Sequence, residues 1–589
     1  MKKLKLPFSG KDLPLSDGQR VWLDGLLSGF SQQAVIRKDF AEDVQIGLPL
    51  AILYGSQTGN AESVAYSCAE MAKSHGLTAQ VIDMEDMRAA DLPAIERLLI
   101  ITSTYGEGEM PDNAETLWQA VSEDDAPQLP QTFFSVLALG DTAYDGFCEA
   151  GKLWDNRLAE LGAKRIAERL DCDVDFEDDA EAWSANVLPI ISQKGSQKLA
   201  EAPQKQAAKA QSQYTRKNPL LATLIAKKTL TGEQSGKEII HYELDLGDSG
   251  ERYQVGGMLN VLPRNHSQLV EELLTVLKAK AEDSVTWRER DITLGELFRD
   301  KLEIRNPSIE LVQAIAERSD NTKLLVLLDQ REQLDDFIYG KDIVYLLNRY
   351  PTAAFDAERL LPLLKPLSPR AYSISSSLNM HDKQVHLTVG SVRYTLQNKK
   401  ILSDRQYLGV CSTWLADSVA VGDKVPCYFS PNKHFTVPQD DNCPMIMVGP
   451  GTGIAPFRAF LEEREVRGAS GDNWLFFGDR EEKNDFIYRD ELMAWQQSGL
   501  LTRLDLAFSR DQAEKIYVQT RMAEHGKALF EWLQRGAYFY VCGDASHMAK
   551  DVDKMLHTII AEHGGLDESG AAAYVEAMKK AKRYVRDVY

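Results

Sequence analysis

The sequence predicts a multidomain α/β protein in which two doubly wound units flank a β-barrel. Strand-like apolar runs alternate with helical patterns over residues 48–191 and again over residues 441–589. This alternation is typical of a parallel sheet with helices on both faces. Residues 219–440 between them are rich in predicted strands, with a helical block at about 266–367 that looks like an insert. The length of 589 residues also requires several cores, since a single core stops growing near ~250–300 residues.

Two further segments complete the predicted organisation. Residues 1–47 include a short pattern of apolar side chains at helical spacing, a candidate for oligomerisation or partner contact. Residues 192–218 are rich in Gln, Ala, Lys and Ser, with almost no large apolar side chain, and predict a flexible linker. A coil of this length spans roughly 25–30 Å, so we expect the first α/β unit to move relative to the rest.

The composition excludes several classes of protein. With 44% hydrophobic and 26% charged residues, wholesale disorder is not expected. No apolar run approaches the ~18 residues of a membrane span, and the basic start lacks the apolar stretch of a secretory signal. The seven Cys residues form no Cys-x-x-Cys pair and no Cys/His cluster. We therefore expect no metal site, no disulfide framework and a reducing cytoplasmic location.

Negative charge is concentrated in the first α/β unit. Residues 48–190 contain 27 Asp and Glu against 8 Lys and Arg, a net of −19 out of the total of −21. Phosphates would repel this unit, so nucleic acid is a poor partner. A basic protein surface is a better one. The alternative is that acidic helices only keep the unit in solution.

A small-residue motif in this unit predicts a phosphate site. Gly-Ser-Gln-Thr-Gly-Asn-Ala at 55–61 follows a predicted strand and opens a helix, where backbone amides attract anions. It lacks the lysine of a nucleoside triphosphatase loop, which favours the monophosphate of FMN. An N-capped turn without a ligand is the alternative.

Two more loops follow strands of the same predicted sheet, at residues 103–109 and 139–148. Ligands bind past the carboxyl ends of parallel strands, which is where these loops lie. Tyr105 and Tyr144 could stack on the two faces of a flat ring. Three loops in this order favour a flavin site over a capped turn.

A second cluster, Arg-Ala-Tyr-Ser-Ile-Ser-Ser at 370–376, predicts a dinucleotide site in the barrel. Arg370 and Tyr372 share one face of a strand, so a guanidinium can pair with a diphosphate beside a ring that stacks on a flavin. Two companion segments follow, Thr-Val-Gly at 388–390 and Gly-Val-Cys-Ser at 409–412. The second enters a helix expected at 413–418 and offers another diphosphate seat.

The last unit predicts a nicotinamide dinucleotide site. A strand runs into a glycine turn at 448–455, where the backbone can approach a dinucleotide closely. Ser509, Arg510 and Lys515 lie downstream, as a 2′-phosphate requires, and Tyr517 can stack on adenine. This pattern favours NADPH over NADH, and a solvated basic loop is the alternative.

In this order the modules resemble the diflavin reductases, over nine-tenths of the chain. The first unit resembles flavodoxin, and the rest resembles the FAD barrel and Rossmann-like NADPH domain of the ferredoxin–NADP reductase superfamily. The resemblance rests on GDSGERYQ (247–254), SPRAYSISSS (368–377), GPGTGIAPFRAF (449–460), FSRDQAEKIYVQ (508–519), YVCGDASHMAKDV (540–552) and KRYVRDVY (582–589). It implies an NADPH-dependent flavin oxidoreductase that passes electrons from NADPH through FAD and FMN to a haem-type partner.

The resemblance also implies a set of site residues. FMN would contact Ser56, Gln57, Thr58, Gly59, Asn60, Ala61, Ser103, Thr104, Tyr105, Gly106, Leu139, Gly140, Asp141, Thr142, Tyr144 and Cys148. FAD would contact Arg370, Ala371, Tyr372, Ser373, Thr388, Val389, Gly390, Tyr394, Gly409, Val410, Cys411 and Ser412. NADPH would contact Gly451, Thr452, Ser509, Arg510, Lys515, Ile516, Tyr517, Val518, Gln519 and Asp551. Ser373, Cys542 and Asp587 would surround the site of hydride transfer, and Tyr589 would cover the FAD ring.

One departure and two alternatives accompany this interpretation. Diflavin reductases usually carry Pro-Gly-Asp after the tyrosine of the second barrel strand, whereas here Val255-Gly256-Gly257 follows Tyr253-Gln254. A reductase that serves another haemoprotein or a flavodoxin-like acceptor would share these motifs. A non-catalytic interaction subunit is the alternative outside the enzymes, although the phosphate loops of all three modules argue against it.

Overall fold

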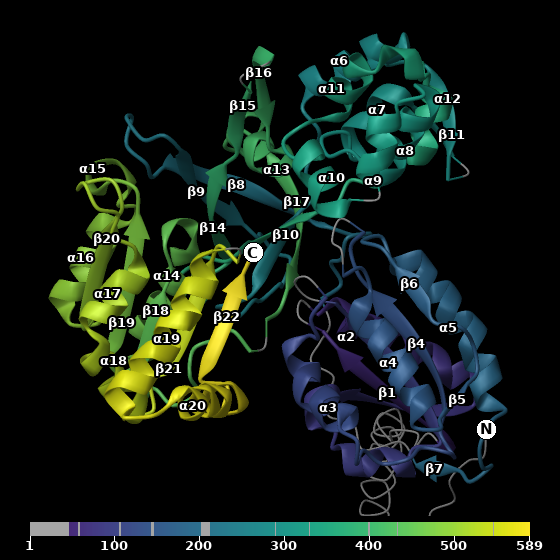
Figure 1. The fold of residues 1–589 in the computed structure, drawn as a ribbon, viewed down its shortest axis with the longest axis horizontal. Helices are drawn as coiled ribbons and strands as arrows, with labels where there is room; N and C mark the ends of the chain where they lie inside the picture. The colour runs from purple at the N-terminus through teal and green to yellow at the C-terminus, as the bar shows by residue number, and fades with distance from the viewer. Residues whose placement is uncertain are drawn as a thin grey trace, which may run out of the picture.

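The computed structural model describes residues 46–56, 59–104, 108–142, 146–201, 212–288, 290–328, 330–398, 401–432, 434–545 and 547–589 (Figure 1). Outside these ranges lie the predicted helix of the N-terminal segment, the central part of the linker, Gln57, Thr58, Tyr105, Gly106 and Tyr144. Within them, no helix is long and apolar enough to cross a bilayer. The described residues also hold no group of His, Cys, Asp and Glu side chains arranged to bind a metal.

The acidic unit is built on a parallel sheet in the order β2-β1-β3-β4-β5, with β6 beside β4 and a short antiparallel β7 beside β1. Helices α2 and α5 share one core with the sheet, and α3 and α4 share the other. This is the predicted doubly wound arrangement. The bounds are β1 Ile46–Gly55, β2 Leu77–Asp83, β3 Arg97–Ser103, β4 Phe133–Leu139, β5 Lys164–Arg165, β6 Leu170–Cys172, β7 Ala200–Glu201, α2 Asn60–Ala72, α3 Asp112–Ser122, α4 Glu149–Glu160 and α5 Glu177–Ser192.

The middle module is an antiparallel barrel. Its strands follow the order β13-β10-β17-β8-β9-β14, and a bridge between Ile374 and Leu387 joins the two ends. A projecting hairpin, β15 and β16, leads into α13. The bounds are β8 Leu220–Thr229, β9 Glu238–Asp245, β10 Met258–Val261, β13 Arg370–Ser373, β14 Gln384–Ser391, β15 Arg393–Asn398, β16 Ile401–Leu408, α13 Val410–Thr413 and β17 Lys424–Ser430.

Two details of this module differ from the sequence prediction. The insert between β10 and β13 has its own apolar core, as a separate helical block requires, but it also contains a hairpin formed by β11 and β12. The helix expected at 413–418 begins earlier, at Val410, because Gly409 is the last residue with an extended backbone. The insert comprises α6 Ser267–Leu277, β11 Ser284–Trp287, β12 Arg290–Thr293, α7 Leu294–Asp300, α8 Ile309–Arg318, α9 Thr322–Leu328, α10 Arg331–Ile338, α11 Ile343–Arg349 and α12 Ala357–Leu360.

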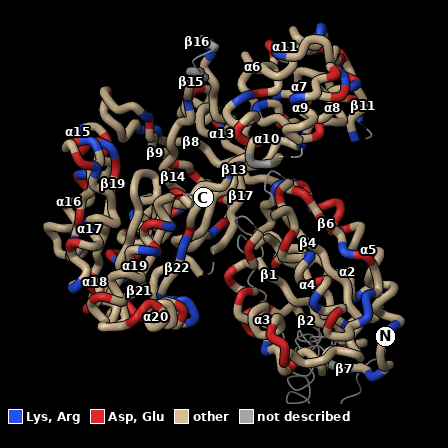
Figure 2. The backbone as a smooth tube through the Cα atoms, in the orientation of Figure 1, with Lys and Arg blue, Asp and Glu red and all other residues tan. Residues whose placement is uncertain are grey.

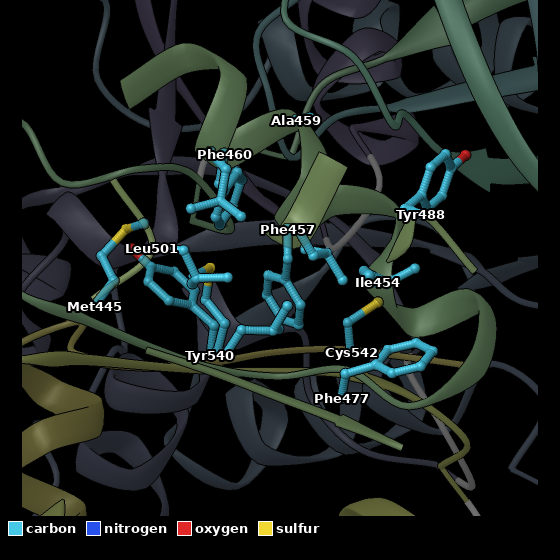
Figure 3. Close-up of a cluster of buried hydrophobic side chains, with 14 of the residues drawn as sticks. Met445, Ile454, Phe457, Ala459, Phe460, Phe477, Tyr488, Leu501, Tyr540 and Cys542 are labelled. Carbon is cyan, nitrogen blue, oxygen red and sulfur yellow. The ribbon is translucent and has the colours of Figure 1, made fainter. Parts of the chain in front are cut away.

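The C-terminal module is a second parallel sheet, in the order β20-β19-β18-β21-β22. Aromatic side chains fill the core on the face of α14 and α16, where Phe457, Phe460 and Tyr540 pack together (Figure 3). Helices α17 to α20 cover the other face. The bounds are β18 Met445–Val448, α14 Ala455–Arg467, β19 Asn473–Asp479, α15 Glu482–Asp485, α16 Arg489–Ser498, β20 Arg503–Phe508, α17 Val518–Glu524, α18 Gly526–Gln534, β21 Tyr538–Gly543, α19 Met548–Gly564, α20 Glu568–Lys580 and β22 Tyr584–Val588.

Ion pairs join the acidic unit to the other two modules. Lys365 Nζ lies 3.4 Å from Asp173 Oδ2, and Arg288 Nη2 lies 2.8 Å from Asp175 Oδ2. Lys582 of the C-terminal module pairs with Glu85. Figure 2 marks acidic residues on several sides of this unit, including positions along α3 and near β6. Part of the excess negative charge therefore faces basic groups of the same chain.

The unusual Val255-Gly256-Gly257 segment, just before β10, packs against the connection that runs from β17 to the C-terminal module. Phe435, after β17, is fully buried among Phe457, Phe460 and Tyr540. Gly256 has a φ of 88°, and a Cβ atom there would lie 1.6 Å from the Phe435 carbonyl oxygen. The segment thus lets the backbone carrying Phe435 cross directly over the barrel.

We predict that Gly256→Ala lowers the thermal unfolding midpoint far more than Gly247→Ala does. Gly247 also has a left-handed backbone, with φ 58°, but a Cβ atom there would have nothing within 4 Å. The control substitution should cost about 1–2 kcal/mol, whereas the clash at Gly256 should cost at least ~3 kcal/mol. Equal midpoints in the two variants would contradict the crossing described here.

Candidate functional site

A large cavity lies where the three modules meet. Its volume is about 3530 Å³, beyond the ~300–1,000 Å³ of an ordinary small-molecule pocket, so it has room for more than one ligand. Residues from all three predicted cofactor sites line it. They are Gly59, Asn60, Ser103, Thr104, Leu139, Gly140, Asp141, Thr142, Arg370, Ala371, Tyr372, Ser373, Thr388, Val389, Gly390, Thr452 and Tyr589.

The acidic unit contributes the carboxyl ends of β1, β3 and β4. Helix α2 begins after Gly59, which has no side chain to cap the helix start. Backbone amides at the start of a helix after a glycine suit a phosphate group. Ser56 and Ala61 are not cavity residues: the Ala61 amide donates to Ser56 Oγ at 3.2 Å and so shapes the turn.

Two residues that carry no sequence motif hold these loops. The buried Asn113 accepts a hydrogen bond from the Ser56 amide and donates one to Asp83, each at 2.8 Å. Asp173 accepts from the Thr142 amide at 3.0 Å and from the Thr142 hydroxyl at 2.7 Å. Asn113 lies early in α3 and Asp173 directly follows β6. Isolated polar residues in such places are common, so the sequence did not indicate either one.

Cys148 is buried behind the third loop. A Cβ atom on Gly140 would lie 2.8 Å from the Cys148 amide nitrogen, so the two backbones pack in direct contact. Burial raises the pKa of the Cys148 thiol to about 12. Cys148 therefore supports the loop as a neutral packing residue and does not line the cavity.

The barrel contributes β13 and β14. Arg370 Nη2 lies 3.0 Å from Glu303 Oε2, which holds the guanidinium at the cavity wall. Burial raises the pKa of Tyr372 well above its ordinary value and that of the neighbouring Cys411 to about 12, so both groups are neutral. A neutral ring beside a guanidinium is the combination that the predicted flavin and diphosphate contacts need.

The other predicted FAD residues lie around this wall. Residues Gly409 and Ser412 bond to the backbone of Val392, which lines the cavity. Val410 and Cys411 are buried beside them in the first turn of α13. Tyr394 lies elsewhere: its hydroxyl donates to the Gly340 carbonyl at 2.7 Å, so it packs against the helical insert outside the cavity lining.

The predicted NADPH residues follow the carboxyl ends of β18, β20 and β21. Arg510, Lys515 and Tyr517 are exposed, and the Gln519 amide donates to Asp551 at 3.1 Å. Ser509 bonds to the Asp479 carbonyl at the end of β19. Ile516 and Val518 instead belong to the apolar core of this module.

Lys237 is a residue that the motifs missed. It lies in the turn between β8 and β9 of the barrel, and its ammonium group lies 2.5 Å from Asp479 Oδ1. A Cβ atom on Gly451 would lie 3.7 Å from that ammonium group. Lys237 lies in a polar turn of the barrel, far in sequence from the C-terminal module that it contacts, so no motif pointed to it.

The predicted hydride-transfer residues meet at the wall of the cavity, which Ser373, Asp587 and Tyr589 line and behind which Cys542 is fully buried. Strand β22 pairs with β21 so that Asp587 lies opposite Cys542. The Ser373 hydroxyl of the barrel donates to Asp587 Oδ2 at 2.8 Å, and Cys542 Sγ lies 3.9 Å from the same oxygen. Tyr589 hydrogen-bonds to Thr452 through its hydroxyl at 3.1 Å, with a ring that is 64% exposed. Burial raises the pKa of Asp587.

The residues present fit the three cofactors. A helix start with glycine at its N-cap suits a monophosphate, and an arginine with two tyrosine rings, Tyr372 and Tyr589, suits a flavin dinucleotide. Gly453 lets the glycine turn pack directly against the backbone of Cys542, since a Cβ atom on Gly453 would lie 2.2 Å from the Cys542 carbonyl oxygen. This packing suits a nicotinamide dinucleotide site beside Cys542. Fold and cavity together define an NADPH-dependent reductase with two flavin sites.

Comparison with known proteins agrees with this class. The Flavodoxin family model matches residues 52–183, the FAD binding domain model residues 212–414 and the Oxidoreductase NAD-binding domain model residues 447–554. These matches confirm FMN, FAD and NADPH as the predicted cofactors and confirm the predicted fold class.

Full-length relatives are more specific. The chain is 40% identical over 587 residues to the sulfite reductase (NADPH) flavoprotein alpha-component of Bacillus subtilis, covering 98% of this chain and 96% of that protein. It is 41% identical to the proteins of the same name from Shewanella sp. (strain MR-4), over 97% of this chain and 95% of that one, and from Vibrio cholerae, over 98% and 94%. The chain belongs to the family of sulfite reductase (NADPH) flavoprotein alpha-components.

We predict that Asn113→Ala releases FMN while FAD is retained. The substitution leaves the Ser56 amide without its buried acceptor, which costs ~1–3 kcal/mol, or roughly tenfold or more in FMN affinity. The FMN-to-FAD ratio of the purified protein measures this. Gln119→Ala, on the exposed face of the same helix, should keep equal amounts of the two flavins. An unchanged ratio in Asn113→Ala would count against the role of this residue.

Proposed function

We propose that this chain takes hydride from NADPH and delivers electrons singly, through its two flavins, to a haem-type partner that reduces sulfite to sulfide. Bound FAD and FMN would supply the conversion between two-electron and one-electron transfer. The protein contributes orientation, charge and exclusion of water. In this proposal residues 48–191 bind FMN, residues 219–440 bind FAD, residues 441–589 bind NADPH, and residues 192–218 connect the first to the others.

The observation that supports the proposal best is the group of Ser373, Cys542 and Asp587 at the wall of the shared cavity, which Ser373 and Asp587 line. Ser373 and Cys542 would orient the nicotinamide ring from two modules. The Asp587 carboxylate would stabilise the positive charge that develops on the ring as hydride leaves. Tyr589 would cover the flavin ring position and move aside when the nicotinamide enters. Gly59, in the turn before α2, lines the same cavity as Tyr372 and Ser373. FMN and FAD would therefore share one cavity.

The partner and the location are part of the same proposal. The relatives are named as alpha-components of a sulfite reductase, which supports a second component, and a sirohaem and iron–sulfur beta subunit would fit a one-electron donor. Residues 1–47 are the proposed contact with that subunit or with further copies of the chain. Absence of a Cys-x-x-Cys pair or Cys/His cluster in the sequence supports a cytoplasmic location.

The first test is the visible spectrum of the purified chain. We expect FMN and FAD in equal amounts, with flavin absorbance that NADPH bleaches, and sulfide formation once the haem-containing beta subunit is added. Protein that stays colourless after reconstitution would overturn the enzyme function. A single type of flavin at full occupancy would overturn the two-flavin path, and electron delivery to other haemoproteins alone would favour a different reductase.

We predict that Asp587→Asn slows bleaching by NADPH about 10²–10³-fold, because one preorganised charge is removed from the reacting ring. Reduction by dithionite should be unchanged. Since burial raises the pKa of Asp587, its ionised form is lost as pH falls through that raised value. The bleaching rate of the native chain should therefore fall toward acid pH, and the Asp587→Asn rate should not follow it. Parallel pH profiles would contradict this role.

We predict that Arg510→Ala with Lys515→Ala weakens NADPH far more than NADH. Both side chains are exposed beyond the strand ends, where a 2′-phosphate would neutralise them. Steady-state KM values for the two nucleotides measure the effect. Lys527→Ala, an exposed cation in α18, serves as the control. Equal weakening of both nucleotides would refute the assignment.

A further inference from the structure

A buried polar cluster joins the barrel to the C-terminal module outside the hydride-transfer group. His241 on β9 lies opposite Thr388 on β14 in the sheet register, and Tyr488 of the C-terminal module reaches both. Tyr488 Oη lies 2.8 Å from His241 Nδ1 and 2.6 Å from Thr388 Oγ1. All three residues are buried, with at most 7% of their surface exposed. Nothing in the proposed mechanism uses Tyr488 or His241.

The surroundings of His241 determine the direction of these hydrogen bonds. Burial, with Arg458, Lys228 and His381 nearby, lowers the pKa of His241 to about 3, so its ring is neutral and carries one proton. Its Nε2 lies 3.4 Å from the Glu243 carboxylate, which only accepts. This carboxylate favours the tautomer that carries its proton on Nε2 and accepts from the Tyr488 hydroxyl at Nδ1. In that tautomer the Thr388 hydroxyl donates to Tyr488, which has only one proton to donate.

Tyr488 is held in this position at a cost. Its backbone has a φ of 55°, the left-handed region that a bulky residue rarely adopts. The Arg458 guanidinium lies 5.1 Å from the centre of its ring and bonds to Glu462, Glu491 and the Ser375 carbonyl. Strain of this kind persists only where the surrounding structure enforces it. The ring and the backbone of Tyr488 are both constrained, so its hydroxyl is held toward His241 and Thr388.

The contact lies beside a place where the barrel and the C-terminal module approach each other at the cavity. Thr388 is two residues before Gly390, where a Cβ atom would lie 3.7 Å from Thr452 Cγ2. Thr452 in turn bonds to the Tyr589 hydroxyl. A shift of β14 relative to the C-terminal module would therefore change the spacing between the barrel wall and the nicotinamide crevice.

We propose that Tyr488 is a positioning residue for hydride transfer: through its hydrogen bond with Thr388, directed by His241, it fixes β14 of the barrel against the NADPH-binding module. The proposal deepens the function given above and rests on it. Tyr488 is buried behind the cavity wall and is not among the residues that line it. It acts by setting the distance and angle between the surfaces that hold them, on which hydride transfer depends steeply.

The test compares Tyr488→Phe, Thr388→Val and the double variant in the full-length holoenzyme. Tyr488→Phe keeps the ring against Arg458 and removes only the hydroxyl. We expect stopped-flow flavin reduction by NADPH to slow about tenfold, the effect of losing one buried hydrogen bond, with little change in the Kd for NADPH. The double variant should be no slower than the slower single variant, because both substitutions break the same bond. Unchanged reduction in Tyr488→Phe, or effects that multiply in the double variant, would overturn the proposal.

A second measurement does not depend on bound flavin. Amide hydrogen exchange of β14, Gln384–Ser391, should be faster in flavin-free Tyr488→Phe than in the flavin-free native chain. Tyr242→Phe is the matched control, because its buried hydroxyl on the same strand as His241 has no hydrogen-bond partner among the described residues. Exchange in β14 that is the same in all three proteins would also overturn the proposal.

The native chain separates this inference from the proposed function. If NADPH fails to reduce the flavins of the native holoenzyme while dithionite succeeds, the proposed function fails. If NADPH reduces native and Tyr488→Phe proteins at the same rate, the function stands and only the positioning role is lost.

Discussion

The hydrogen bond from the Ser373 hydroxyl to the Asp587 carboxylate joins the barrel to the last strand of the chain, and the geometry of the cavity depends on it. It forms because β22 adds to the edge of the C-terminal sheet in register with β21, which brings Asp587 beside Cys542. A carboxylate in this half-buried position needs the donor, since an unpaired charge there would be costly. The same pairing places Tyr589 at Thr452, so the chain end becomes part of the cavity wall.

Charge gives the acidic unit a different kind of attachment. Its contacts with the other modules include partly exposed ion pairs, such as Asp173 with Lys365 and Asp175 with Arg288. Pairs of this kind contribute about 0–1 kcal/mol each and weaken with salt. The buried contacts around Phe435, by contrast, join barrel and C-terminal module through an apolar core. The molecule thus combines an apolar interface between barrel and C-terminal module with partly exposed ion pairs to the acidic unit.

The Val255-Gly256-Gly257 segment shows how a departure from a family pattern can be structural. The left-handed backbone of Gly256 and the contact with the Phe435 carbonyl make a side chain there untenable. Gly256 therefore accommodates the crossing of the chain that connects the two modules.

Much of this protein could be predicted from local sequence. Apolar periodicity predicted both parallel sheets and the barrel, and the small-residue turns before α2 and α14 marked their carboxyl edges, because both signals arise from residues close together in the chain. The hydride-transfer role of Ser373, Cys542 and Asp587 was predicted only from the resemblance to a known family. Asn113, Asp173, Lys237 and Tyr488 carry no local signal. Tyr394 packs against the insert, and Val518 and Ile516 pack in or against an apolar core, away from their predicted ligands. Their roles depend on which elements lie side by side, and that is decided by the packing of modules far apart in the sequence, where a side chain's partners belong to other strands.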